Sequence, residues 1–285
     1  MKNFLSKIKT ERVYVFLILL FGMISVFVTF PLGNGDEGYH LSKSYNIFSM
    51  NHPKSMKKTV VRQLEYQAIG LDGDMKDFDV ETFYIKKLKD VEKDSFCFNI
   101  AYDRNITMQI DIAHIPAAIG VMVGRVIYPS YGIMLLCSRI SSLLFFALCM
   151  GAIIKKSTVG KWTLFMLFSI PCIQKLASPS YDVFSYVVFA MYSMNIFELA
   201  KLRTIKEISK QKLLYTLITI ILLLFCKKNY LFALAVIPFL PIFFLRILEW
   251  LDNKKMSVKI VIFVTGIIVM LVLLVGLNYY LNLFS

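Results

Sequence analysis

The chain has 285 residues, of which 57% are hydrophobic and only 18% are charged, and its mean hydropathy is +0.63. This composition excludes an ordinary soluble domain and predicts an all-α polytopic membrane protein with a single membrane domain. The formal net charge of +13 would also suit a nucleic-acid partner. Most Lys and Arg residues, however, flank apolar runs or lie in one long loop, so we interpret them as topology signals and expect no nucleic acid.

The first long apolar run covers residues 13–30 and follows a short basic segment, residues 1–12. Its length is about what a bilayer requires. A secretory signal peptide would look similar, but no small-residue cleavage site follows the run. We therefore predict an uncleaved first span whose N-terminal segment lies in the cytoplasm.

An acidic segment begins where this run ends, and it holds Asp36, Glu37 and His40 within five residues. Two glycines and an asparagine precede the acids, so the backbone can turn sharply as it leaves the membrane. Acids in a first helical turn often only cap backbone N–H groups and complement the helix dipole. Their position at the mouth of a transmembrane helix favours a functional role, and we predict that these three residues are catalytic.

The chain then stays polar to about residue 111, and a short apolar segment, residues 117–128, follows. This segment is interrupted by Gly120, Gly124 and Arg125 and is too short to span a bilayer comfortably. We interpret it as an interfacial or re-entrant helix. Residues 31–131 are therefore predicted to form one ordered external loop that carries juxtamembrane helices.

Further apolar runs bring the predicted total to about seven transmembrane helices. They cover residues 132–154, 162–174, 181–199, 213–226, 230–245 and 261–281. If residues 117–128 do not cross, most basic residues between the later runs fall on the cytoplasmic side, as the positive-inside rule requires. If that segment crossed, every later loop would be inverted. The rule therefore predicts that the first loop is external.

With this topology, polar residues that are costly at a membrane gather on the outer face. Those outside the acidic segment are predicted to bind substrate, and they are Arg139, Gln174, Ser180, Asp182, Lys227, Lys228 and Tyr230. Each charged one also has a structural explanation: the two lysines can snorkel and Asp182 can cap its helix. Arg139 can pair with a buried acid. Their convergence on one face favours the functional interpretation.

This set of residues suits transfer from a lipid-linked phosphate donor. A carboxylate at the membrane edge can take a proton from an acceptor hydroxyl. Lys or Arg side chains at the same depth can hold the lipid phosphate and stabilise the charge of the leaving group. Asp36 and Glu37 also leave a divalent cation open as a cofactor, but two adjacent acids do not establish a metal site.

The arrangement resembles the GT-C glycosyltransferase superfamily, in which an acidic pair follows the first transmembrane helix at the head of a long external loop. It is more similar to an uncharacterised bacterial family of predicted membrane proteins built on the same plan. The motifs that carry this resemblance span most of the chain in order. They are Pro31…Asp36-Glu37…His40, Pro116…Gly124-Arg125, Arg139, Pro171…Gln174…Ser178-Pro179-Ser180-Tyr181-Asp182 and Lys227-Lys228-Asn229-Tyr230…Pro238. The resemblance implies a catalytic acid at Asp36 or Glu37 and a lysine, Lys227 or Lys228, that meets the lipid phosphate.

We therefore expect an integral, multi-pass membrane glycosyltransferase in a bacterial plasma membrane. It would move a sugar from a polyprenyl-phosphate donor to a cell-envelope glycan, lipid or protein on the outer face. The alternative is a non-enzymatic transporter or assembly subunit for lipid-linked glycans. A transporter should place charges near the bilayer midplane on discontinuous helices related by a pseudo-repeat, and the sequence shows no repeat.

Overall fold

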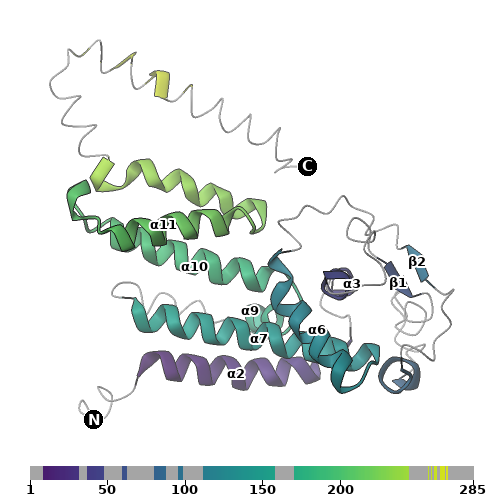
Figure 1. The fold of residues 1–285 in the computed structure, drawn as a ribbon. Coiled ribbons are helices and arrows are strands. Elements are labelled where there is room, and N and C mark those ends of the chain that lie inside the picture. The colour runs from purple at the N-terminus through teal and green to yellow at the C-terminus, as the bar shows by residue number, and fades with distance from the viewer. Residues whose placement is uncertain are drawn as a thin grey trace.

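The computed structural model of the chain describes residues 9–31, 37–47, 60–62, 80–87, 96–98, 112–157 and 170–243, together with scattered positions between 256 and 268. Its long helices are α2 (Thr10–Val28), α7 (Tyr131–Lys156), α10 (Asp182–Leu199) and α11 (Lys210–Leu223). α7 contacts both α2 and α10, and α10 contacts α11, so the helices lie side by side in that order (Figure 1). The fold is therefore helical, as the composition predicts.

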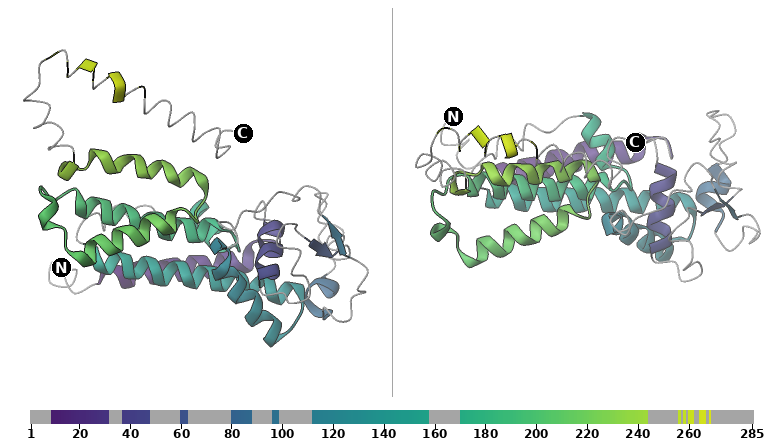
Figure 2. Two further views of the ribbon diagram at one scale, coloured as in Figure 1. Left: turned by 45° about the horizontal axis from the view of Figure 1, so that its top comes forward. Right: turned by 90° about the horizontal axis from the view of Figure 1, so that it is seen from above.

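The smaller elements of the first half gather at one end of these long helices, away from the start of α2 (Figures 1 and 2). They are α3 (Glu37–Ile47), β1 (Val60–Arg62), the π-helical turn η3 (Glu81–Ile85), β2 (Phe96–Phe98) and α6 (Ile115–Ile127). β1 and β2 pair antiparallel, with Val60 opposite Phe98, and form the one sheet of the described residues. The described parts of the long loop thus lie together, and the rest of the loop predicted over residues 31–131 lies outside the described residues.

α2 turns one face toward α7 and the opposite face outward. Its buried positions are spaced four residues apart, at Tyr14, Ile18, Gly22 and Val26. A Cβ atom on Gly22 would lie 2.3 Å from Cδ1 of Leu143, so glycine allows the two helices to come close. Large apolar side chains cover the other face, where Phe27 is 64% exposed. This is the pattern of a helix whose outer face meets lipid.

α6 packs against α7 through two glycines spaced four residues apart. A Cβ atom on Gly120 would lie 2.2 Å from the carbonyl oxygen of Cys137, and one on Gly124 would lie 2.8 Å from Cα of Met134. Small residues at this spacing let helix backbones approach closely. At about 1.5 Å per residue α6 is roughly 20 Å long, shorter than the roughly 30 Å hydrocarbon core. Its length fits the predicted helix that does not cross.

Serine side chains start two of the long helices. Ser130 Oγ accepts a hydrogen bond of 3.4 Å from the backbone N of Ile133 at the start of α7. Ser209 Oγ accepts one of 3.2 Å from the backbone N of Lys212 at the start of α11. Such caps satisfy N–H groups that have no partner in a first helical turn. They explain why both helices begin before the apolar runs predicted from hydropathy.

The prediction of seven transmembrane helices is not confirmed. Among the described residues, α2 and α7 are long and apolar enough to cross a membrane, and each has a mean hydropathy of 2.1. The predicted run 162–174 is described only as α9 (Ile170–Leu176), since residues 162–169 lie outside the described part. Most of the run 261–281 lies outside it as well.

The predicted run 230–245 forms η7 (Lys228–Phe239), which is a 3₁₀ helix of 12 residues and not an α-helix. Pro238 lies inside it and has no backbone N–H to donate. A 3₁₀ helix rises about 2.0 Å per residue, so η7 covers roughly 24 Å where an α-helix of equal length would cover roughly 18 Å. A second 3₁₀ turn, η6 (Ile205–Glu207), lies between α10 and α11.

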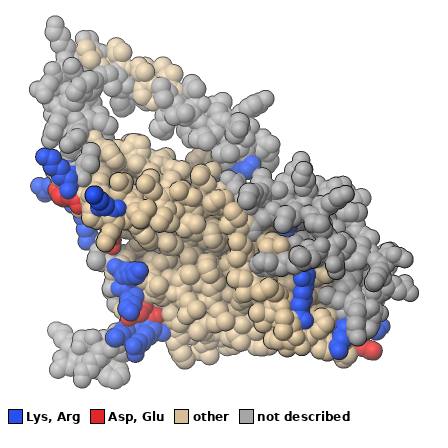
Figure 3. Space-filling model, viewed as in Figure 1, with Lys and Arg blue, Asp and Glu red and all other residues tan. Residues whose placement is uncertain are grey.

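The charged side chains visible on the described surface gather toward the ends of the long helices, and the middle is uncharged (Figure 3). Lys155 and Lys156 end α7, and Lys210 begins α11, at the end where α2 starts. An uncharged band between charged ends suits a bundle embedded in a bilayer.

Candidate functional site

A buried ion pair joins α3 to α7. Arg139 Nε donates to Oε1 of Glu37 at a distance of 2.8 Å, and its Nη2 donates to Oε2 at 2.7 Å. The two side chains are 1% and 0% exposed. A guanidinium and a carboxylate that meet in this forked way form the strongest type of ion pair in proteins, and its geometry is specific.

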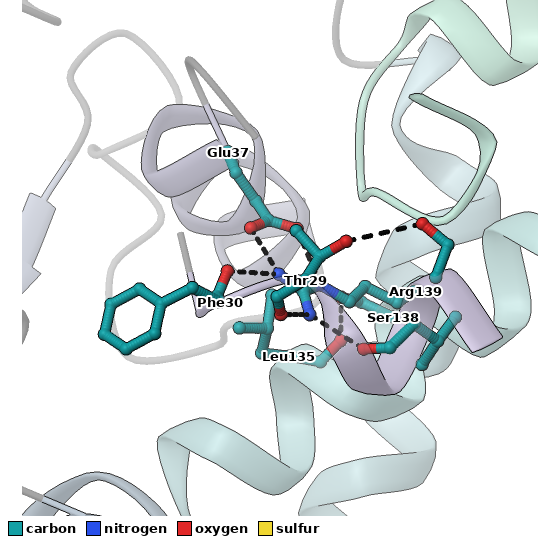
Figure 4. Close-up of polar contacts among 8 residues, drawn as sticks. Thr29, Phe30, Glu37, Leu135, Ser138 and Arg139 are labelled. Atoms are coloured by element: carbon teal, nitrogen blue, oxygen red, sulfur yellow. Dashed lines mark hydrogen bonds and ion pairs between the residues drawn. The ribbon is translucent and has the colours of Figure 1, made fainter. Parts of the chain in front are cut away.

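Arg139 also binds the end of α2. Its Nη1 donates to the carbonyl oxygens of Val26 and Thr29, both over 2.9 Å, and Nη2 donates to that of Phe30 over 3.0 Å (Figure 4). Carbonyls at a helix C-terminus have no partner within their own helix. With the two bonds to Glu37, all five N–H groups of Arg139 are used. The residue therefore ties the end of α2 and the start of α3 to α7.

These contacts give Glu37 and Arg139 a structural role. Both carboxylate oxygens of Glu37 accept from Arg139, and the side chain is fully buried, so its carboxylate is engaged within the protein. Arg139 likewise has no N–H left for a phosphate. The pairing matches the structural explanation that the sequence allows for Arg139. Asp36, the other predicted catalytic acid, lies outside the described residues.

His40, one turn along α3 from Glu37, meets a histidine at the start of α6. His40 Nδ1 lies 2.8 Å from Nε2 of His114, and the two rings are 5.1 Å apart between centroids. Their exposed fractions are 6% and 0%. Arg125 at the other end of α6 donates to the carbonyl oxygen of Tyr45 over 3.1 Å and lies over its ring. α6 therefore holds α3 at both ends.

The start of α10 closes the other side of His40. Ser180 Oγ lies 3.5 Å from His40 Nε2 and accepts a 3.1 Å bond from the backbone N of Asp182. The Tyr181 ring makes a T-shaped contact with both histidines, with centroid distances of 4.8 Å to His40 and 5.7 Å to His114. The start of α6 and the start of α10 thus both contact the His40 imidazole of α3.

Lysine side chains add positive charge to this cluster. Lys227 Nζ lies 5.6 Å from the centroid of the Tyr181 ring, and Lys175 lies in α9. Burial, followed by the charges of His114, Lys175 and Lys227, holds the pKa of His40 well below its usual range. His40 is therefore neutral at pH 7, and one of its nitrogens has a lone pair that can accept a proton.

The four other residues predicted to bind substrate are Gln174, Asp182, Lys228 and Tyr230. Gln174 is exposed on α9, and Asp182 is the first residue of α10. Lys228 begins η7, and Tyr230 packs its ring against Tyr186, 6.5 Å away between centroids. The structure thus brings Ser180 into contact with His40, places Lys227 near them over the Tyr181 ring, and gives Tyr230 a packing role between α10 and η7.

Sequence reasoning missed His114 and Lys175. His114 directly precedes the helix that Pro116 begins, and the chain contains only 3 histidines, so a rare imidazole beside a quoted motif was the available signal. Lys175 follows Gln174 and gives no signal of its own. The residues that the structure describes contain no group of three His, Cys, Asp or Glu side chains that could hold a metal ion. The expectation of a divalent cation therefore gains no support from the described part.

Comparison with known proteins identifies a family but no activity. The model of a predicted membrane protein family, DUF2142, matches residues 19–282. No curated protein sequence and no solved structure matches the chain.

Proposed function

The chain belongs to the predicted membrane protein family DUF2142, and we propose that it is a membrane glycosyltransferase that uses a polyprenyl-phosphate-linked sugar. The observation that carries the proposal is the convergence of His40, Ser180 and Lys227 at one end of the helical bundle. A polar cluster beside lipid-facing helices suits a substrate whose head group is polar and whose tail stays in the bilayer.

The proposed topology places this cluster on the outer face of a bacterial plasma membrane, with the N-terminus in the cytoplasm and about seven spans. It rests on the basic residues at the opposite end of the bundle, which include Lys155, Lys156 and Lys210. Basic residues accumulate on the cytoplasmic side of membrane proteins.

The proposed reaction forms a bond between an acceptor hydroxyl oxygen and the anomeric carbon of the sugar. The bond from that carbon to the phosphate oxygen breaks, and its electron pair leaves with the polyprenyl phosphate. Lys227 and Lys175 would stabilise the phosphate charge. The acceptor is a cell-envelope glycan, lipid or protein, and its hydroxyl must lose a proton during the reaction.

The acidic segment supplies the candidates for accepting this proton. Glu37 is held by Arg139, so Asp36 and His40 are the candidates that remain. The Glu37–Arg139 pair fixes the first residue of α3, directly after Asp36. We therefore assign Glu37 a positioning role in the proposed reaction.

Direct binding and turnover test the proposal. The full chain in lipid nanodiscs should bind a polyprenyl phosphate more tightly than phosphatidylglycerol, which carries a similar charge on a diacyl tail. With a panel of radiolabelled polyprenyl-phosphate sugars it should release free polyprenyl phosphate in the presence of an envelope extract. Equal affinity for both lipids, together with no release from any donor, would reject the glycosyltransferase.

Cysteine labelling tests the topology. In a cysteine-free background, Gln174→Cys and Lys206→Cys replace exposed residues on α9 and η6. A membrane-impermeant maleimide on intact cells should label position 174 only, and position 206 should need opened cells. The reverse pattern would place the polar cluster in the cytoplasm.

A further inference from the structure

The contact between His40 and His114 gives the cluster a property that neither residue has alone. We propose that the two histidines act as one proton-accepting pair, in which His40 takes a proton through Ser180 and His114 orients His40 and shares that proton. The chemical identity of the reaction rests on the proposed function. The pair itself rests on the geometry of α3, α6 and the turn before α10.

The three side chains form a line from the turn before α10 to the start of α6. Ser180 Oγ faces His40 Nε2 at 3.5 Å, and His40 Nδ1 faces His114 Nε2 at 2.8 Å. The first distance is long for a hydrogen bond, as is common for catalytic contacts that tighten when substrate binds. The second is short and buried, so it determines how the His40 ring is held.

The proposed pair uses one of the two proton arrangements that this line allows. When His40 donates its Nδ1 proton to His114, its Nε2 keeps a lone pair that points toward the Ser180 hydroxyl. A base held in this way by a second group is the general pattern of an activated hydroxyl. Ser180 Oγ already accepts from the backbone N of Asp182, so its own proton is available for His40.

The proposed step transfers one net proton from the acceptor to the histidine pair through three linked shifts, and every atom is balanced. The acceptor hydroxyl gives its proton to Ser180 Oγ while Ser180 gives its own proton to His40 Nε2. The Nδ1 proton of His40 shifts toward His114 Nε2, so the two rings together hold one positive charge. The acceptor oxygen keeps its electron pair for the bond to the anomeric carbon. The shared proton belongs to the pair and not to one ring, as in other closely coupled sites.

The surroundings keep the pair ready to accept a proton. Among the described residues, the titratable groups near His40 are Tyr181, whose ring packs against it, and His114, Lys175 and Lys227, whose positive charges repel a proton on it. Burial and these positive charges favour the neutral imidazole, in agreement with its lowered pKa. A phosphate that binds the lysines would offset their part of this repulsion, so we expect the pair to become a stronger base when the donor is present.

Histidine NMR tests the pair without any substrate. The chain has 3 histidines, so ¹⁵N-histidine labelling of the full chain in nanodiscs gives three imidazoles, and His52→Gln leaves only the proposed pair. We expect His40 to carry its proton on Nδ1. His114→Phe should release this preference and give a mixture of tautomers, whereas His114→Gln, which can still accept from Nδ1, should keep it. An unchanged His40 tautomer in His114→Phe, or a proton on Nε2 in the native chain, would overturn the proposal.

Turnover separates orientation from folding. His114→Phe should lower kcat by roughly a hundredfold, since a misplaced catalytic group costs about that much. His114→Gln should lose clearly less, with donor KM unchanged and the same melting temperature. Equal losses in both variants that follow their melting temperatures would make His114 a packing residue. Full loss on Asp36→Asn with unchanged turnover on His40→Asn would assign the proton to the acid, and the glycosyltransferase proposal would still stand.

Discussion

Two buried polar pairs anchor α3, one turn apart, and they differ in chemistry: the first joins two opposite charges and the second joins two imidazole rings. In the first, Glu37 and Arg139 engage both carboxylate oxygens and all five guanidinium N–H groups. In the second, His40 makes one short bond to His114 and a long contact to Ser180. An ion pair whose N–H groups are all used fixes structure, whereas a neutral imidazole can accept a proton.

The difference teaches that charge alone is a poor guide to chemistry at a membrane edge. Glu37 carries one of the charges that favour a catalytic role for the acidic segment, yet its carboxylate is buried and paired with Arg139. His114 lies in no predicted site, yet its Nε2 lies 2.8 Å from Nδ1 of His40 and holds the ring whose other nitrogen faces Ser180. The variants below change one pair at a time.

Arg139→Met should have the largest effect. It leaves Glu37 buried without a partner and frees the carbonyls at the end of α2, which should cost about 3–5 kcal/mol of folding stability. Thermal unfolding followed by size-exclusion chromatography would measure it. Adding Glu37→Gln should restore part of the loss, because the unpaired charge is then gone. A single variant as stable as the native chain would show that the pair does not hold α3.

His40→Asn should lower turnover by at least about a hundredfold, the usual contribution of a positioned proton acceptor. Its melting temperature should change far less than that of Arg139→Met, since the fold keeps the first pair. Release of polyprenyl phosphate and thermal unfolding, measured on the same preparation, give both values. A large fall in stability with normal turnover would reverse the roles of the two pairs.

Lys227→Ala should weaken polyprenyl phosphate binding about tenfold to a hundredfold. A hydrogen bond to a charged group contributes roughly 1.5–3 kcal/mol, and about 1.4 kcal/mol corresponds to a factor of ten. Lys206→Ala, which removes an exposed lysine at the opposite end of the bundle, is the matched control. Equal effects of the two substitutions would mean that only net charge matters.

The smallest effect concerns pH. Because the pKa of His40 is lowered in the folded chain, the unfolded chain binds a proton first as the pH falls below about 6.5. Stability should therefore be complete above that pH and should decrease below it by at most about 1.4 kcal/mol per pH unit. His40→Asn should flatten the slope measured by thermal unfolding between pH 7 and pH 5, and Lys206→Ala should leave it unchanged.

The apolar runs predict the long helices well because a continuous apolar stretch can be recognised from neighbouring residues alone. α2 and α7 begin within a few residues of the predicted positions, and the polar turns of the later helices meet at one end. The 3₁₀ geometry of η7 was not predictable, because apolar content over residues 230–245 does not separate one helix type from another.

The candidate site is less accessible to sequence reasoning because its contacts are distant along the chain. Glu37 and Arg139 are 102 residues apart, and His40 and His114 are 74 apart. A local pattern can nominate Glu37 and His40, but only the packing of α6 on α7 determines which side chain each of them meets. For this reason the predicted catalytic acid Glu37 is paired with Arg139, while His114, which was not predicted, becomes the partner of His40.

The glycine contacts between α6 and α7 have a mechanical consequence. Gly120 and Gly124 bring the two backbones into direct contact, and Ser141 adds a 2.7 Å bond to the carbonyl oxygen of Pro116. α6 and α7 therefore form one rigid unit, in which His114 lies at the start of α6 and Arg139 lies in α7. A methyl group at Gly120 would push α6 and α7 apart. It would therefore disturb the contact of His114 with His40 and that of Arg139 with Glu37 at the same time. The alignment of the imidazoles thus depends on a helix contact that two glycines and one serine make, outside the polar cluster itself.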